Sequence, residues 1–422
     1  MSDYDDFIQC IKDGNPKALD YLAKRNGKYE FPSVVGDVAV NGNQALREAA
    51  GYGHLAIVDS LLGKKEDGTY EFPDIVGRIA ALDTEVLCRA SENGHLVVVD
   101  RLLQKKEDGT YEFLDVVNSI ASESNYALRW AAKNGHLAIV DRILRKKEDG
   151  TYEFPSVAGG VAARGNYAFC YAARNGHLAI VDRLLVKKED GTYEFPDVVG
   201  GIAANDNHAL CYAAFSGHKA IIDRLLGKKA DGAYEFPDVV GGITANDNYA
   251  LCYAAFSGHK AIVDRLLDKK ADGAYEFPDV VGGVATNNNE ALQGAVRNHY
   301  HEISRVLAQV SWPSISDMPE DLKNNAVLMA SIREGFRMQS VRRGNVYLLN
   351  DFVGHSAPLI FSLAGREYDG MVGRSGDNTS YIFKQPVEDY MGYVRDGDKP
   401  NEADARNNGQ PEEPNNLRCG PG

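Results

Sequence analysis

Apolar residues recur along this chain in groups with helical spacing, and residues 250–290 show the pattern most clearly. The first group is Ala250, Leu251, Ala254 and Ala255. The second group is Ile262, Val263, Leu266 and Leu267. Because residues at i, i+1, i+4 and i+5 lie on one face of a helix, each group predicts a short amphipathic helix. Gly258 and His259 stand between the groups, where glycine can adopt the left-handed conformation that ends a helix.

A polar segment with a turn signal follows the second predicted helix. Asp272 and Gly273 favour a tight turn, and Tyr275 and Phe277 lie on one side of an extended segment. This segment predicts a projecting hairpin or hairpin-like loop. Pro278 then suits the first turn of a short third helix. Its apolar positions are Val280, Val281, Val284 and Ala285.

The same elements return every 41 residues, and two sequence markers keep this interval. The first marker is a Gly-His pair, with its histidines at His54, His95, His136, His177, His218 and His259. The second is a Tyr-Glu-Phe motif that begins at Tyr29, Tyr70, Tyr111, Tyr152, Tyr193, Tyr234 and Tyr275. A fixed period of this size is typical of a solenoid, because one small unit cannot bury its apolar face alone. We therefore expect a repeat array over roughly residues 1 to 308.

The stretch from Asn248 to Leu267 resembles the ankyrin repeat. It shares the helix lengths, an Ala-Ala pair, the Gly-His turn and a Val-x-x-Leu-Leu second helix. The period of 41 departs from the usual value of about 33, and Tyr249-Ala-Leu-Cys252 replaces the usual Thr-Pro-Leu-His. A HEAT or armadillo unit of about 40–47 residues fits the period better, but the Gly-His turn favours an ankyrin-like variant. Long-period arrays of this kind also resemble ankyrin-type effectors of intracellular bacteria, which implies action in a host cell.

These patterns together predict an all-α repeat solenoid of ankyrin-like helix pairs, with projecting hairpin loops and a short third helix in each unit. Residues 1–40 are expected to form a degenerate N-terminal capping repeat. Residues 41–308 are expected to form the array, with six good units and a degenerate last one. Residues 309–394 are assigned to a C-terminal helical cap and a small region of unknown fold. Residues 395–422 lack apolar periodicity and are expected to be a disordered tail.

The charge balance and the N-terminus limit partners and location. The formal net charge is -14 and the pI is about 5.2, whereas binders of nucleic acid or anionic membrane need a basic surface. We therefore expect neither partner. The N-terminus lacks the basic segment and apolar run of a secretory signal, and no run of about 18 apolar residues occurs. We expect a cytoplasmic, reducing location, with release into a host cell without a classical signal peptide as the alternative.

The histidines and cysteines of the array are expected to be structural. One histidine per unit cannot supply the three or four converging ligands of a metal site, so we assign the Gly-His histidines to hydrogen bonding at the turn. Stacked helices lie about 8–10 Å apart, which is too far for a disulfide between equivalent positions. Small core residues are therefore expected at Cys88, Cys170, Cys211 and Cys252. We expect no metal and no cofactor.

Two aromatic columns on the first helices are the candidate partner-binding residues. They are Tyr126, Trp130, Tyr167, Tyr171, His208, Tyr212, Tyr249 and Tyr253. The ankyrin resemblance implies that the column of Trp130 and Tyr171 faces solvent along a concave surface. Aromatic side chains anchor interfaces because they bury much area at low entropic cost. The alternative is that they pack against neighbouring repeats and contact no partner.

The sequence contains no nucleophile elbow, phosphate loop, His-Glu-x-x-His pair or cysteine cluster. We therefore expect a monomeric, non-enzymatic scaffold that binds one or more proteins through the concave face and the hairpins. Two alternatives stay open. In one, the array selects a target for an activity carried by residues 309–394, where His355, Asp369 and Arg374 are available. In the other, the array is purely structural and has no dedicated partner.

Overall fold

The structure is a computed structural model of the 422-residue chain, and it describes residues 2–79, 81–284, 289–312 and 317–343. The chain divides into two parts, Met1–Gly354 and His355–Gly422. All described residues belong to the first part. The sequence-based candidates His355, Asp369 and Arg374, together with the predicted tail, therefore lie outside the described residues.

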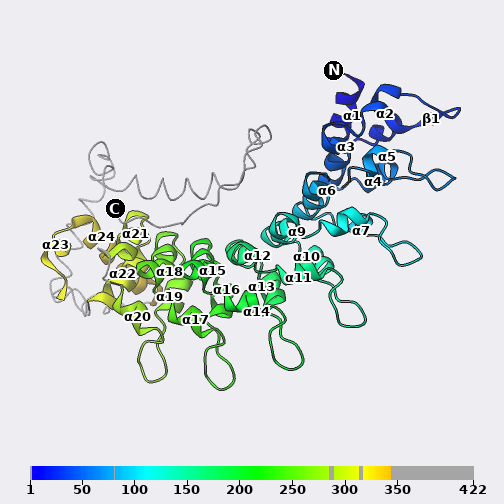
Figure 1. Cartoon of the computed structure of the whole chain (residues 1–422). Coiled ribbons are helices and arrows are strands. Elements are labelled where there is room, and N and C mark those ends of the chain that lie inside the picture. Colours follow the sequence, from blue (N-terminus) through cyan, green and yellow to red (C-terminus); the bar gives the residue numbers. More distant parts are fainter. Residues whose placement is uncertain (1, 80, 285–288, 313–316, 344–422) are drawn as a thin grey trace, which may run out of the picture. The chain divides into compact units, whose positions relative to one another are not determined.

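Three rows of helices make up the array, and each regular unit from α3 to α20 contributes one helix to each row (Figure 1). The first helices are α3 (Val40–Gly51), α6 (Ala81–Glu92), α9 (Ser122–Lys133), α12 (Ala163–Arg174), α15 (Ala204–Ser216), α18 (Ala245–Phe256) and α21 (Glu290–Arg297). The second helices are α4 (Leu55–Leu61), α7 (Leu96–Leu102), α10 (Leu137–Ile143), α13 (Leu178–Leu184), α16 (Lys219–Leu225), α19 (Lys260–Leu266) and α22 (His301–Ser311). The third helices are α2 (Pro32–Asp37), α5 (Pro73–Val76), α8 (Leu114–Asn118), α11 (Pro155–Gly159), α14 (Pro196–Gly200), α17 (Pro237–Gly241) and α20 (Pro278–Gly282).

The core lies between neighbouring units. Each first helix packs against the next one in the row, as α12 does against α15. The facing positions are fully buried alanines such as Ala172 and Ala213, and these small side chains let the helices approach closely. The second helices add larger apolar residues, of which Val181 and Leu184 have no exposed surface. This packing confirms the prediction of an all-α repeat solenoid, because each unit completes its core only against its neighbours.

A hairpin-like loop connects the second helix to the third in each unit. One antiparallel bridge closes each loop, for example between Lys146 and Tyr152. At the tip, the carboxylate of Asp149 accepts hydrogen bonds from the backbone N–H and the hydroxyl of Thr151, at 2.8 and 2.6 Å. The phenylalanine that follows, such as Phe154, is buried and directly precedes the third helix. Most of the third helices begin with proline. The hairpin and the third helix predicted from the sequence are therefore both present.

The ends of the array depart from the regular unit. The first unit consists of α1 (Asp3–Lys12), the 3-10 helix η1 (Pro16–Leu22) and the strands β1 (Lys24–Arg25) and β2 (Lys28–Tyr29), which pair antiparallel. A 3-10 helix thus stands where the pattern of the other units has a second α-helix. At the other end, α23 (Glu320–Lys323) and α24 (Ala326–Arg343) follow the last unit, and α24 packs against α22.

Candidate partner-binding surface

Each first helix from α9 to α18 has three consecutive residues in the left-handed region directly after its first residue. In α18 these are Asn246, Asp247 and Asn248, with φ values of 51, 56 and 68°. Left-handed backbone costs most L-residues roughly 1–2 kcal/mol each, and Asn and Asp adopt it most readily because their side chains bond locally. The Asn-Asp-Asn sequence therefore suits this turn. The turn brings the chain from the third helix of one unit to the first helix of the next.

The last asparagine of each turn fixes the third helix of its own unit. Nδ2 of Asn166 donates to the carbonyl oxygen of Val198 at 2.7 Å, and Nδ2 of Asn207 donates to that of Val239 at 2.7 Å. Both amide side chains are only 2% exposed. The same bond occurs at Asn43, Asn125 and Asn248. The residue that follows this asparagine in α12, Tyr167, is one of the eight aromatic candidates.

The eight aromatic candidates lie at equivalent positions of α9, α12, α15 and α18, two on each helix, and we call this set the aromatic ribbon. It comprises Tyr126, Trp130, Tyr167, Tyr171, His208, Tyr212, Tyr249 and Tyr253. All eight side chains are half-buried. Within one helix the rings pair, with centroids 4.0 Å apart for Tyr167 and Tyr171 and 5.1 Å apart for His208 and Tyr212. Between helices, the centroids of Tyr171 and Tyr212 lie 6.4 Å apart, so the rings of α12 and α15 meet in this column.

Three cations lie over the rings at the N-terminal end of this ribbon. Nζ of Lys133 is 3.9 Å from the ring centroid of Trp130. Cζ of Arg174 lies 5.5 Å from the centroid of Tyr171 and 5.3 Å from that of Tyr212. Cζ of Arg129 lies 4.8 Å from the centroid of Tyr167. These distances are within the range of cation–π attraction.

Arg129 is the most unusual of the three because its side chain is only 4% exposed. Its Nε donates to the carbonyl oxygen of Ser124 at 2.8 Å, and its Nη2 donates to that of Glu123 at 2.7 Å. Burial lowers the pKa of the guanidinium, since it disfavours the charged form. Equivalent positions in other units hold cysteines, whose thiols point at the same turn: Sγ of Cys211 is 3.7 Å from the carbonyl oxygen of Asp206.

The cysteines equivalent to Arg129, which include Cys170, Cys211 and Cys252, are free thiols. Burial raises the pKa of Cys170 and of Cys211 to about 12, so both stay protonated at neutral pH. Across the described residues, no group of three or more His, Cys, Asp or Glu side chains is arranged to hold a metal ion. No described helix combines the length and apolarity that crossing a membrane requires.

The Gly-His histidines connect neighbouring units. The backbone N–H of His177 closes its own turn by donating to the carbonyl oxygen of Ala172 at 2.9 Å. The side chain extends to the preceding unit, where Nε2 lies 2.9 Å from the carbonyl oxygen of Lys133. His95, His136 and His259 make the same contact at the same distance. The glycine of the preceding pair is required here, because a Cβ on Gly135 would lie 2.6 Å from Cε1 of His177.

The hairpin glutamates form a row of ion-paired clusters along the array, which we call the glutamate ladder. Glu194 accepts from Oη of Tyr152 at 2.8 Å and contacts Nζ of Lys146 at 2.9 Å and Nη1 of Arg183 at 3.3 Å. Tyr152 and Lys146 belong to the preceding hairpin. Burial raises the pKa of Glu194, but the bonds from Lys146 and Tyr152 and the charge of Arg183 outweigh this and hold it below its usual range. Equivalent clusters surround Glu112, Glu153, Glu235 and Glu276.

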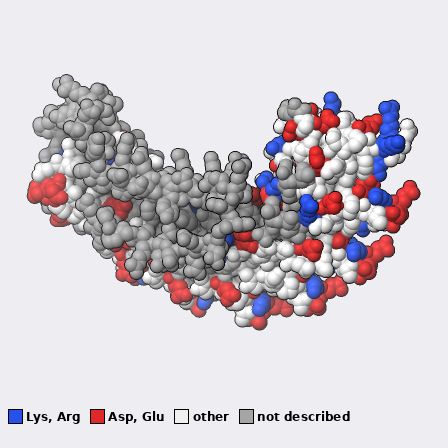
Figure 2. Space-filling model, turned by 45° about the horizontal axis from the view of Figure 1, so that its top comes forward, with Lys and Arg blue, Asp and Glu red and all other residues white. Residues whose placement is uncertain are grey.

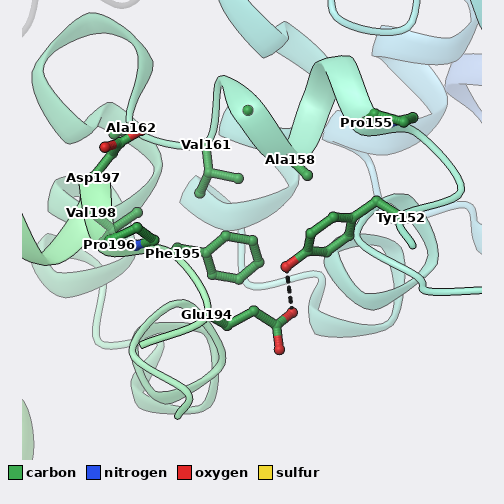
Figure 3. Close-up of a pocket in the computed structure, with 11 residues that line it drawn as sticks. Tyr152, Pro155, Ala158, Val161, Ala162, Glu194, Phe195, Pro196, Asp197 and Val198 are labelled. Carbon is green, nitrogen blue, oxygen red and sulfur yellow. Dashed lines mark hydrogen bonds between the residues drawn. The ribbon is translucent and has the colours of Figure 1, made fainter. Parts of the chain in front are cut away.

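A shallow pocket of about 320 Å³ lies beside this ladder, between α11 and α14 (Figure 3). Tyr152 and Glu194 stand at one end of it, and Ala158 and Val161 form part of its wall (Figure 3). Other units have valine where this one has Ala158, namely Val35, Val76, Val117, Val199, Val240 and Val281. Ala158 lacks the two methyl groups of these valines, and the pocket lies beside it in the row of third helices.

The aromatic columns were visible in the sequence, but the groups that surround them were not identified there. The turn asparagines recur every 41 residues, from Asn125 to Asn248, which was a usable signal for a buried polar role. Lys133 and Arg174 share one repeat position, which holds phenylalanine in the next two units, and Arg129 stands where four other units have cysteine. A search for identical residues in register therefore passes over them, although they give the ribbon its charge.

Two comparisons with known proteins bear on this surface. No curated protein matches the chain significantly. A family model matches residues 128–235, which extend from within α9 to the hairpin before α17 and include Trp130, Tyr171 and Tyr212 of the ribbon. This matched stretch is described as ankyrin repeats in three copies, a family of repeats that generally serve as protein–protein interaction modules.

Proposed function

We propose that this chain is a non-enzymatic scaffold that binds one or more partner proteins on the aromatic ribbon. The observation that carries the proposal is the set of eight half-buried rings at equivalent positions of four neighbouring first helices. Aromatic side chains in this state of burial add contact area with little loss of side-chain entropy, which suits interface anchors. The matched ankyrin repeats support a protein as the partner. The resemblance to bacterial effector arrays extends the proposal to a protein of a host cell.

The projecting hairpins are a second exposed surface, and an experiment must separate them from the ribbon. The tips carry exposed lysines at equivalent positions, including Lys188, Lys229 and Lys270. The ribbon is therefore tested with Tyr171, Tyr212 and Tyr253 changed to alanine, and the hairpins with these three lysines changed to alanine. Each triple variant alters three neighbouring units, so the two are matched in number and place.

The full chain serves as bait in a host-cell lysate, and the affinity of each captured protein is then measured for the purified variants. We expect the tyrosine variant to lose at least tenfold in affinity and the lysine variant to bind like the unaltered chain. Circular dichroism must show the same helix content in all three proteins. Unchanged affinity of the folded tyrosine variant would remove the ribbon from the proposal, and loss confined to the lysine variant would move binding to the hairpins.

A further inference from the structure

The aromatic ribbon has two chemically different halves. Among the four helices of the ribbon, the residue at or next to the C-terminal end is a cation in α9 and α12, Lys133 and Arg174, and an aromatic residue in α15 and α18, Phe215 and Phe256. The buried Arg129 belongs to the same cationic half, over the rings of Tyr126 and Tyr167. In the aromatic half, the rings of Phe215 and Tyr253 meet edge to face at 5.6 Å. The ribbon is thus positive over α9 and α12 and apolar over α15 and α18.

The arginines of this half differ from those of the second helices. Arg142, Arg183 and Arg224 each contact two carboxylates, as Arg183 does with Asp141 and Glu194. Among the described residues, by contrast, no carboxylate lies within ion-pair distance of Arg129 or Arg174. A buried cation without a counter-charge is costly to the fold, so an anionic group that approaches it gains more than it would on an exposed surface.

Two acidic residues lie near the cationic half, and neither is within ion-pair distance of Arg129 or Arg174. Glu92 faces Lys133 from the preceding unit, and burial raises its pKa. Glu123 is exposed and lies 3.9 Å from the exposed Arg164. Elsewhere on the described surface, Lys and Arg side chains are intermixed with Asp and Glu (Figure 2). The unpaired arginines therefore stand out in a chain whose net charge is -14.

We propose that the cationic half of the ribbon binds acidic side chains of an extended peptide segment in the partner protein, and that apolar side chains of the same segment lie on the aromatic half. This inference rests on the proposed function and names the chemistry of its partner. Charge complementarity carries it, because carboxylates would supply the counter-charge that Arg129 and Arg174 lack among the described residues. A nucleic-acid backbone is disfavoured, since three cations over two helices cannot offset the repulsion from an acidic chain.

The spacing of the helices gives the spacing of the recognised residues. Neighbouring helices lie about 8–10 Å apart, and an extended peptide advances about 3.3 Å per residue. One helix spacing therefore corresponds to roughly three peptide residues. We expect acidic residues at intervals of about three, followed or preceded by apolar residues at the same interval.

The acidic-peptide proposal is tested by selecting a random dodecapeptide library, displayed on phage, against the full chain immobilised on beads. Two substitutions introduce residues that other units carry at the same positions: Arg129→Cys, as in Cys170, and Arg174→Phe, as in Phe215. The double variant combines them. These residues already fit the same helix elsewhere in the array, so we expect both variants to fold. We expect the unaltered chain to enrich peptides with spaced Asp or Glu and apolar residues at least tenfold over bare beads. The double variant should lose that acidic preference, and raising the salt concentration from about 0.1 to 0.5 M should weaken binding.

Several outcomes would overturn the inference. If the enriched peptides are neutral or basic but depend on Tyr171, Tyr212 and Tyr253, the proposed function stands and only the acidic class is wrong. If acidic peptides are enriched equally on the double variant, these arginines do not select them. Enriched peptides that ignore both the arginines and the tyrosines count against the ribbon as a whole, as does a library that yields no enrichment.

Discussion

The side-chain amide of Asn166 lies against the backbone of Gly201, with Nδ2 2.9 Å from the position that a Cβ would occupy. The amide reaches past this glycine to the carbonyl oxygen of Val198. The neighbouring Gly200 faces open space within 4 Å of its own Cβ position. One glycine of the pair thus permits the contact that holds the third helix, and the other does not take part in it.

Gly201→Ala should therefore destabilise the array, whereas Gly200→Ala should not. The added methyl group at position 201 pushes the amide away from its acceptor, and overpacking of this kind costs about 1–3 kcal/mol. At position 200 alanine replaces glycine in a helix without a clash, which stabilises by about 0.4–1 kcal/mol. The urea midpoint of helix unfolding measures both. Equal midpoints for the two variants would contradict the role assigned to Asn166.

Sequence alone predicted the rows of helices because each apolar position is repeated in several units, so the pattern is independent of any single residue. It also located the aromatic columns. It did not reveal that Asn166 bonds to Val198, because the partners lie 32 residues apart and only the folded third helix brings them together. Nor did it reveal the charge of the ribbon, because most units carry a cysteine where Arg129 stands, so the repeat pattern does not indicate a cation at this position.

The burial of His177 predicts a dependence of stability on mildly acidic pH. Burial lowers the pKa of His177 below its ordinary value of 6.5, and His136 and His218 lower it further by repulsion. The native state therefore binds fewer protons than the unfolded chain, so its stability is full above pH 6.5 and falls as pH drops below that value. Unfolding in urea at pH 8 and at pH 5.5 should show a smaller difference for His177→Gln than for the unaltered chain. An equal difference would mean that His177 does not contribute.

Glu194 predicts a separate loss of stability at lower pH. The bonds from Lys146 and Tyr152 and the charge of Arg183 hold its pKa below the ordinary 4.5 despite burial. Protonation is thus disfavoured in the native state, and this contribution is present above pH 4.5 and is lost as pH falls through the lowered value. Glu194→Gln should lower the urea midpoint at pH 7 and approach that of the unaltered chain near pH 3. The exposed Glu189, at the tip of the same hairpin, supplies the control Glu189→Gln, which should change neither midpoint.

Ala158 predicts a stabilising substitution, because the pocket beside it exists where other units place a valine. Ala158→Val adds two methyl groups to a half-buried wall of a space of about 320 Å³. At about 0.8 kcal/mol per fully buried methylene, partial burial should raise the free energy of unfolding by about 1 kcal/mol. The reverse change at the same position of the next unit, Val199→Ala, should lower it by a similar amount. If Ala158→Val lowers the urea midpoint instead, the pocket is set by backbone placement of α11 and α14 and not by the missing side chain.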